Sequence, residues 1–216
     1  MDTATQTVDS SVQKSAWILA AIAVIEGAWV IMNFYVNGAK FIAYLGFAPG
    51  KSGSVSGWIA AAVVTAIFVV LSLRLPSVRA NLFRPSLLKL LGLAVAISAG
   101  ILEEAVFRRW TMNWIMQQGM GDVMQVLGSA ALFGLLHGVW GLFGGSIRAA
   151  FGATLATGFL GGMLAVVFLL SGRSLAPCIA AHFFINALAE PGLVLAATRG
   201  EMGSLHAKSI SPILSP

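Results

Sequence analysis

The sequence predicts an all-α fold, a polytopic transmembrane helical bundle with about six membrane spans. Of the 216 residues, 58% are hydrophobic and only 10% are charged, whereas a soluble domain carries about 25% charged residues. The mean hydropathy is +0.88. The apolar residues gather in runs of about 20, the length that a helix needs to cross a bilayer. Because lipid offers the backbone no hydrogen bonds, we expect these runs to be helical.

Six segments are long and apolar enough to span a membrane. In chain order they are about 16–36, 57–75, 87 to as far as 118, 123–143, 147–170 and 175–197. The connections contain turn-forming residues, as in "FAPGKSGS" and "QQGMGD". We therefore expect one transmembrane helical domain over residues 16–198, between a polar N-terminal tail (1–15) and a polar C-terminal tail (199–216).

The net charge of +5 comes from basic residues in short loops, a pattern that indicates membrane anchoring and no nucleic-acid partner. With six spans, one side receives Lys14, Arg74, Arg79, Arg84, Lys89, Arg148, Arg199 and Lys208. The other side receives Lys40, Lys51 and Arg173, with Arg108 and Arg109 if these reach the surface. This bias predicts that both termini are cytoplasmic. The small size and the short polar N-terminal tail are typical of a bacterial inner-membrane protein.

Charged and polar side chains interrupt four of the apolar runs. A charge near the bilayer centre costs about 2.5–3.5 kcal/mol, so each of these side chains needs a reason. They are Glu26 in the first span, Glu103, Glu104, Arg108 and Arg109 in the third, His137 in the fourth, and His182, Asn186 and Glu190 in the sixth.

The two neighbouring glutamates of the third span have different expected surroundings. Glu104 and Arg108 are four residues apart with the acid first, so they can neutralise each other. Glu103 points about 100° away and has no partner on its own helix. His182 and Asn186 are also four residues apart and share one helix face.

Together with His137, these residues can surround one water-filled pocket. A carboxylate such as Glu103 beside an imidazole can take a proton from water, which makes water a nucleophile. A second imidazole and the carboxamide of Asn186 can donate hydrogen bonds to the oxyanion that forms. As an alternative, Glu103, His137 and His182 resemble a catalytic zinc site with an open position. We favour the chemistry that needs no cofactor, because Asn186 beside His182 is more typical of an oxyanion-binding pair.

Three short motifs carry a family resemblance. "EEAVFR" (103–108) matches the pattern EExxxR, "FGLLH" (133–137) matches FxxxH, and "HFFIN" (182–186) matches HxxxN after the lead-in "GRSLAPCIAA". The segment of about 87–193 thereby resembles the CAAX protease and bacteriocin-processing family, the ABI-type intramembrane glutamate endopeptidases related to the type II CAAX prenyl endopeptidases.

The resemblance implies a buried endopeptidase site in a helical bundle. It implies that Glu103 and His137 activate water and that His182 and Asn186 form the oxyanion hole. It also gives Glu104 and Arg108 a supporting role. Arg109 departs from the family pattern, which often has Gly after the motif arginine. We expect that bulky charge either to narrow the cleft or to bind an acidic group of the substrate.

Other intramembrane protease chemistries find no support. The only aspartates are Asp2, Asp9 and Asp122, all expected in tails or loops, and no HExxH motif occurs. The GxSG match, "GKSG" (50–53), falls in an expected connection and not in a span. Cys178 lies one turn before His182, but we expect it to be a small apolar filler rather than a nucleophile.

Glu26 and Glu190 match no motif, and we expect both to be structural, with a role in substrate or water access as the alternative. Pro191 suggests that Glu190 lies near a helix end.

The expected function is hydrolysis of a peptide bond in a membrane-associated peptide or protein, with or without an attached lipid. The expected partners are that substrate and membrane lipid. A different class of function stays open, namely a non-proteolytic immunity or scaffold protein that keeps the motif residues as polar contacts between helices. A proton or ion path ranks last, because the first two spans offer only Glu26.

Overall fold

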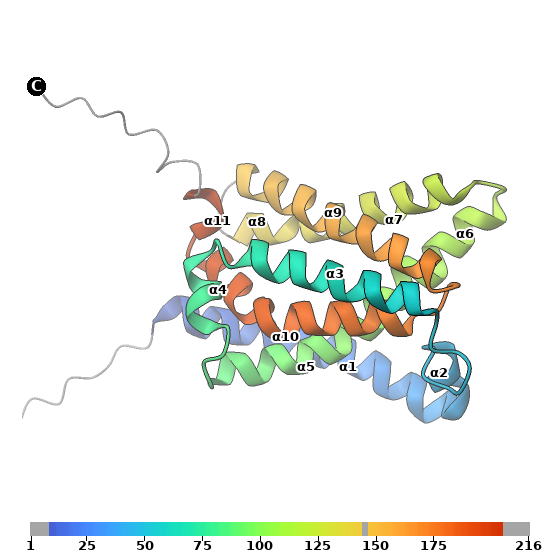
Figure 1. Cartoon of the computed structure of the whole chain (residues 1–216). Helices are drawn as coiled ribbons and strands as arrows, with labels where there is room; N and C mark the ends of the chain where they lie inside the picture. The colour runs from blue at the N-terminus through green and yellow to red at the C-terminus, as the bar shows by residue number, and fades with distance from the viewer. Residues whose placement is uncertain (1–8, 144–146, 205–216) are drawn as a thin grey trace, which may run out of the picture.

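The computed structural model describes residues 9–143 and 147–204, and this part of the chain is helical without any strand. Figure 1 shows the long helices packed side by side along one direction. The helices long and apolar enough to cross a membrane are Ser10–Asn37, Val55–Ser72, Leu87–Gln117, Asp122–Gly141, Ile147–Leu170 and Ala176–Thr198. The predicted all-α bundle with about six spans is confirmed.

Short helices complete the fold between and after the long ones. The elements are α1 (Ser10–Asn37), α2 (Ala39–Tyr44), α3 (Val55–Ser72), α4 (Pro76–Asn81), α5 (Leu87–Glu104), the π-helix η1 (Ala105–Thr111), α6 (Met112–Gln117), α7 (Asp122–His137), α8 (Val139–Phe143), α9 (Ile147–Leu170), α10 (Ala176–Thr198) and α11 (Glu201–Ser204). The third span therefore consists of α5, η1 and α6 in direct succession.

The first helix begins earlier than the expected residue 16, inside the expected N-terminal tail. The Asp9 side chain accepts a hydrogen bond from the Ser11 backbone N–H at 3.0 Å, a typical helix N-cap. One turn later, Ser15 is fully buried, and its hydroxyl lies 2.9 Å from that of Thr198 near the end of α10. Polar side chains thus extend α1 by packing against α10. Residues 1–8 and 205–216 of the expected tails lie outside the described part of the chain.

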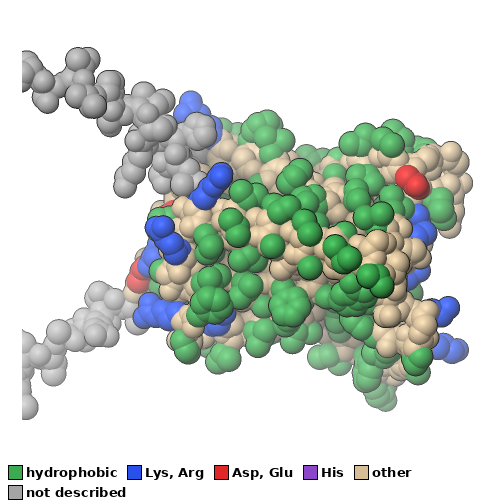
Figure 2. Space-filling view, viewed as in Figure 1, with side chains coloured by type: hydrophobic (Ala, Val, Ile, Leu, Met, Phe, Trp, Pro, Cys, Tyr) green, Lys and Arg blue, Asp and Glu red, His purple; other side chains and the backbone are tan. Residues whose placement is uncertain are grey.

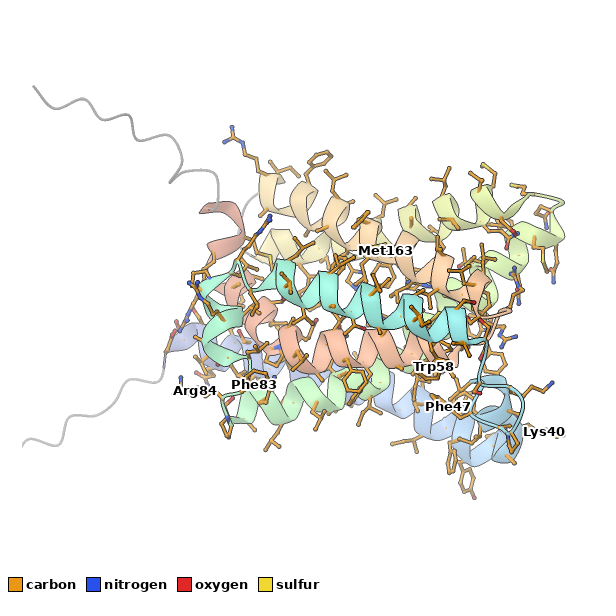
Figure 3. The ribbon with its side chains drawn as sticks, in the orientation of Figure 1. Lys40, Phe47, Trp58, Phe83, Arg84 and Met163 are labelled. Carbon is orange, nitrogen blue, oxygen red and sulfur yellow. The ribbon has the colours of Figure 1, made fainter. Side chains whose placement is uncertain are left out.

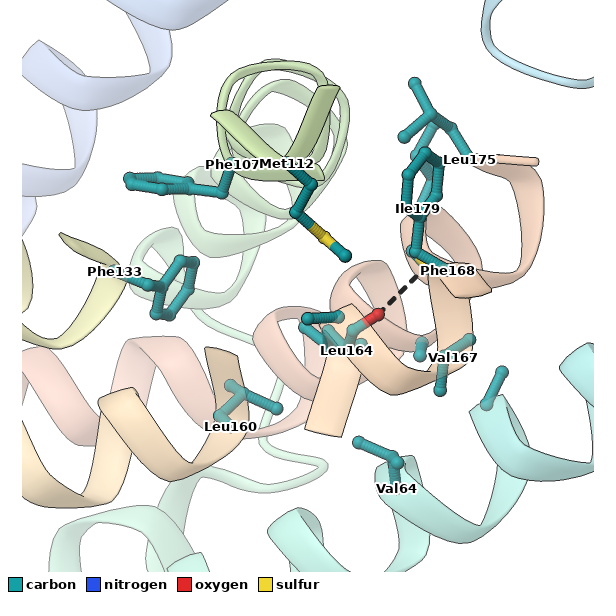
Figure 4. Packing of buried hydrophobic residues seen from close by; sticks show 14 of the residues in the cluster. Val64, Phe107, Met112, Phe133, Leu160, Leu164, Val167, Phe168, Leu175 and Ile179 are labelled. Atoms are coloured by element: carbon teal, nitrogen blue, oxygen red, sulfur yellow. Dashed lines mark hydrogen bonds between the residues drawn. The ribbon is translucent and has the colours of Figure 1, made fainter. Parts of the chain in front are cut away.

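The last span, α10, is the centre of the bundle. It packs against α1, α3, α4, α5 and α9, and it is the most buried of the spans. The main core lies beside it, where the rings of Phe107 and Phe133 meet edge to face at 5.0 Å between centroids. Figure 4 shows these rings with Met112 and Leu164. This core joins the helices that carry the three motifs.

The outer surface has the character of a membrane protein. Figure 2 shows hydrophobic side chains over the middle of the visible face and Lys and Arg side chains towards its two ends. Figure 3 places Arg84 and Phe83 at one end of the bundle and Lys40, Phe47 and Trp58 at the other. Basic and aromatic residues at both ends are typical of the two membrane interfaces. The chain is therefore an integral membrane protein.

Candidate active site

The third span changes its winding directly after the two motif glutamates. It is α-helical to Glu104, becomes a π-helix over Ala105–Thr111 and returns to an α-helix at Met112. The π-helical segment has no Pro or Gly that would signal this change, so the sequence analysis does not predict it. π-Helical turns occur often at functional sites, because they turn side chains out of the regular register.

Glu104 is fully buried and contacts both Arg108 and His182. Its Oε2 lies 2.9 Å from Arg108 Nε, and both side chains are 0% exposed. Its Oε1 lies 2.7 Å from His182 Nδ1. The Arg108 guanidinium also stacks 4.9 Å from the centre of the Phe133 ring. The spacing correctly predicts the pair of Glu104 and Arg108, but it does not reveal that Glu104 also holds His182 on another helix.

Glu103 lies between two imidazole rings. Its Oε2 is 3.5 Å from His137 Nε2 and 3.7 Å from His182 Nε2. Its side chain remains 18% exposed, in contrast to the sealed Glu104. The structure therefore brings together the carboxylate and the two imidazoles that the motifs single out.

The Nδ1 atoms of His137 and His182 make the contacts that orient the two rings. His137 Nδ1 lies 2.8 Å from the Phe133 carbonyl oxygen, and His182 Nδ1 lies at the Glu104 carboxylate. Because a carbonyl and a carboxylate accept hydrogen bonds, both Nδ1 atoms carry a proton and donate it. Each Nε2 is then the atom that faces Glu103. The Phe133 ring stacks on the His137 ring at 4.2 Å and holds its plane.

A cavity of about 410 Å³ opens at this point. Glu103, His137, His182 and Asn186 all line it, so the four residues expected to surround one pocket do so. Asn186 is 8% exposed and makes no hydrogen bond to the described residues. Most of the remaining wall is apolar, including Phe68, Val95, Leu136, Trp140, Leu160 and Leu193.

A second cavity of about 390 Å³ adjoins the first and is lined mainly by apolar side chains. The two share six lining residues, namely Phe68, His137, Trp140, Thr157, Glu190 and Leu193. The apolar space therefore continues from the polar centre towards α4 and α11, because Leu75 borders α4 and Met202 belongs to α11.

Two acids that match no motif also line the first cavity. Glu26 comes from α1, and its Oε2 accepts a hydrogen bond from the Ser98 hydroxyl at 3.2 Å. Glu190 comes from α10. The expectation that Pro191 places Glu190 near a helix end is wrong, because α10 continues to Thr198. The spacing of four residues from His182 to Asn186 to Glu190 was the only signal for this position.

Two other side chains lie apart from the cavity. The expectation that Arg109 narrows the cleft is wrong, because Arg109 turns away and donates from Nη2 to the Tyr44 carbonyl oxygen at 3.0 Å. Its guanidinium lies 5.0 Å from the Tyr44 ring centre. Arg109 thus connects α2 with the third span. Cys178 is fully buried in the core, where its thiol donates to the Leu164 carbonyl oxygen at 3.5 Å.

Glu103, His137 and His182 are the residues that the sequence leaves open as a zinc site. Among residues 9–143 and 147–204, no three His, Cys, Asp or Glu side chains are placed to hold a metal ion as they stand. The zinc site and the form without a cofactor both stay predictions.

Comparison with known proteins supplies a family similarity. The family model described as type II CAAX prenyl endopeptidase Rce1-like matches residues 85–188, which contain all three motifs. No curated protein and no solved structure matches the chain. Residues 85–188 are therefore similar to the type II CAAX prenyl endopeptidase Rce1-like family, as the motifs predict.

Proposed function

We propose that this protein is an intramembrane endopeptidase in which Glu103 and His137 activate a water molecule. The single observation that carries the proposal is the position of Glu103, which lines a cavity and whose Oε2 lies 3.5 Å from His137 Nε2 and 3.7 Å from His182 Nε2. A partly exposed carboxylate beside an imidazole suits proton transfer from water. The sealed Glu104 cannot reach water and suits a supporting role.

The first chemical step is attack by water. The Glu103 carboxylate takes one proton from a water molecule that His137 helps to orient, and the water oxygen bonds to the carbonyl carbon of the substrate. The carbonyl becomes an oxyanion. Asn186 donates to it from its free amide N–H, and His182 donates from Nε2 when the ring carries both protons. Glu104, at 2.7 Å from His182 Nδ1, pairs with that positively charged ring.

The second step breaks the peptide bond. The oxyanion collapses to a carboxyl group, and the carbon–nitrogen bond releases the amine. The proton held on Glu103 passes to that amine, so the site returns to its starting state. No covalent intermediate with the protein forms. Glu104 and Arg108 are supporting residues that hold His182, because their ion pair of 2.9 Å is sealed from the cavity.

The substrate that fits this site is a membrane-associated peptide or protein. The wall of the first cavity is mostly apolar, and the adjoining cavity of about 390 Å³ extends that surface. Such a surface takes up hydrophobic parts of a substrate from the bilayer. Apolar side chains or an attached lipid both supply such a part. Membrane lipid is then both the surroundings of the protein and the route of substrate entry.

Cleavage of peptides in proteoliposomes tests the proposal. The purified full chain is incubated with a library of quenched transmembrane peptides, before and after chelation, beside the variants Glu103→Gln and His137→Ala. The proposal expects cleavage by the wild type and a loss of at least about 100-fold in each variant, the usual size of a general-base contribution. Undiminished cleavage by Glu103→Gln would overturn it.

Chelation of metal ions distinguishes the mechanism without a cofactor from the zinc-dependent mechanism. Activity that survives chelation supports the form without a cofactor. Activity that is lost on chelation and restored by zinc makes Glu103, His137 and His182 ligands after a rearrangement of their side chains. A folded protein that cleaves no peptide supports the scaffold or immunity function.

We also propose a location in a bacterial inner membrane with both termini in the cytoplasm. The basis is the excess of Lys and Arg on the side that holds both termini. Fusion of a reporter that is active only in the cytoplasm to the C-terminus of the full chain tests the orientation. An active fusion supports it, and an inactive but inserted fusion overturns it.

A further inference from the structure

Three carboxylates from three different spans line the same cavity. Glu26 belongs to α1, Glu103 to α5 and Glu190 to α10. Only Glu103 has a place in the proposed reaction. Glu26 and Glu190 lie outside the matched range 85–188 and belong to none of the three motifs.

The lining of the cavity contains no Lys or Arg side chain. Its basic groups are His137 and His182, which both have places in the proposed reaction, and the nearby Arg108 is paired with Glu104. Glu26 accepts one hydrogen bond, from Ser98. Within the described part of the chain, Glu190 makes no hydrogen bond or ion pair. Both side chains are partly buried at a mostly apolar wall, where a positively charged ligand group can pair with them.

Asn186 supplies a second and independent observation. Its side chain is 8% exposed, lines the cavity, and has no hydrogen-bond partner among the described residues. Its amide atoms are not among the fully buried unpartnered atoms, so they face the cavity and are open to a polar group that arrives with the substrate. Its N–H is assigned to the oxyanion, and its carbonyl oxygen is free to accept from a donor such as an amide or an ammonium group.

We infer that Glu26 and Glu190 form a specificity subsite for a basic side chain, Lys or Arg, that flanks the cleaved bond. The inference rests on the proposed function. A lysine or arginine stem is apolar and suits the wall of Ile22, Phe68 and Leu193, while its charged end reaches the carboxylates. A metal ion fits less well, because no three acidic, histidine or cysteine side chains of the described residues are arranged to bind one.

A lysine scan tests the subsite. A transmembrane peptide that the enzyme cleaves is made in versions that carry a single lysine, or norleucine of the same chain length, at successive positions around the cleaved bond. Wild-type protein in proteoliposomes should prefer lysine at one position by at least about 10-fold in kcat/KM. In the double variant Glu26→Gln/Glu190→Gln, the ratio of lysine to norleucine should fall to about 1. Each single variant should fall between these values.

A matched control removes a carboxylate elsewhere. Asp122→Asn lies at the start of α7, away from the cavity lining, and should keep the lysine preference of the wild type. All variants are first compared by size-exclusion chromatography, so that the ratio is measured on folded protein. Equal kcat/KM for lysine and norleucine at every position in the wild type, or an unchanged ratio in the folded double variant, would overturn the inference.

A binding measurement separates the subsite from the proposed reaction. If the wild type cleaves no peptide, the same lysine and norleucine peptides are titrated in a fluorescence competition assay. Binding of a lysine peptide at least about 10-fold tighter than its norleucine partner, lost in the double variant, would keep the subsite and reject the endopeptidase. No preference in binding would reject both.

Discussion

The ammonium group of Lys89 lies 2.6 Å from the carbonyl oxygen of Ala187. Pro191 has no N–H, so it leaves this carbonyl, four residues before it, without its helical partner. Lys89 donates to that oxygen, and to the Leu82 carbonyl oxygen at 2.7 Å. A basic side chain of α5 thus replaces the backbone hydrogen bond missing in α10. The replacement keeps α10 helical as far as Thr198 and keeps the nearby Glu190 at the cavity.

Replacing this ammonium group should destabilise the bundle through α10. We expect Lys89→Met to lower the free energy of unfolding by roughly 1.5–3 kcal/mol, the usual size of hydrogen bonds to a charged group. Lys40→Met is the control, because Lys40 is exposed on α2. Thermal unfolding in detergent measures both. In a Pro191→Ala background, the substituted residue regains a backbone N–H that can reach the Ala187 carbonyl oxygen, so the cost of Lys89→Met should shrink. An equal cost in both backgrounds would contradict this account.

The same substitution should affect stability at one of the two adjacent motif glutamates and peptide cleavage at the other. Glu104→Gln leaves the sealed Arg108 cation without its carboxylate, and breaking a buried pair in this way costs roughly 3–5 kcal/mol. Glu103→Gln has no such buried cation to leave unpaired, because its side chain is partly exposed. We therefore expect a large fall in melting temperature for Glu104→Gln and a small change for Glu103→Gln, while peptide cleavage is lost in the latter. Equal melting temperatures would show that the Glu104 contact is not structural.

The fold was predictable from the sequence because each span is a separate, long apolar segment. The segment 147–170 was placed with the bounds that α9 has, since helix ends in lipid coincide with the ends of apolar runs. The start of α1 was less predictable. It depends on Asp9 as a cap and on the contact of Ser15 with Thr198, and the latter joins residues far apart in the chain.

The site was predictable where its residues share one helix and less so where they do not. The pair of Glu104 and Arg108 follows from a spacing of four residues. The contact of Glu104 with His182 spans 78 residues and depends on how α5 packs against α10. Glu26 belongs to no motif, and its place at the cavity follows from the packing of α1 on α5. The winding of η1 has no local sequence signal.

The close packing of α7 on α9 should depend on Gly134. A methyl group on Gly134 would lie 2.5 Å from the Thr154 carbonyl oxygen and 2.9 Å from Gly158 Cα, so the backbones would have to separate. We expect Gly134→Ala to lower the free energy of unfolding by roughly 1–3 kcal/mol, the usual cost of overpacking. Gly152→Ala is the matched control on α9, because a methyl group there meets nothing within 4 Å. It should be neutral or stabilising by up to about 1 kcal/mol, since alanine favours helices. Equal changes in melting temperature for Gly134→Ala and Gly152→Ala would contradict the close contact of α7 with α9 at Gly134.

The ends of the described chain are joined by an ion pair whose effect should depend on pH. The Arg199 guanidinium donates to the Asp9 carboxylate at 2.5 Å, and this hydrogen bond holds the pKa of Asp9 below its usual range. A lowered pKa in the folded state means that the contact stabilises the fold at pH values above the ordinary pKa of about 3.9 and that this effect is lost as the pH falls through the lowered value. The pair is exposed, so the effect should be small.

The melting temperature of Asp9→Asn should therefore lie slightly below that of the wild type at neutral pH. The difference should narrow as the pH falls below about 4. A difference that stays constant with pH would contradict this account, because both the contact with Arg199 and the hydrogen bond from Ser11 N–H lower the pKa of Asp9.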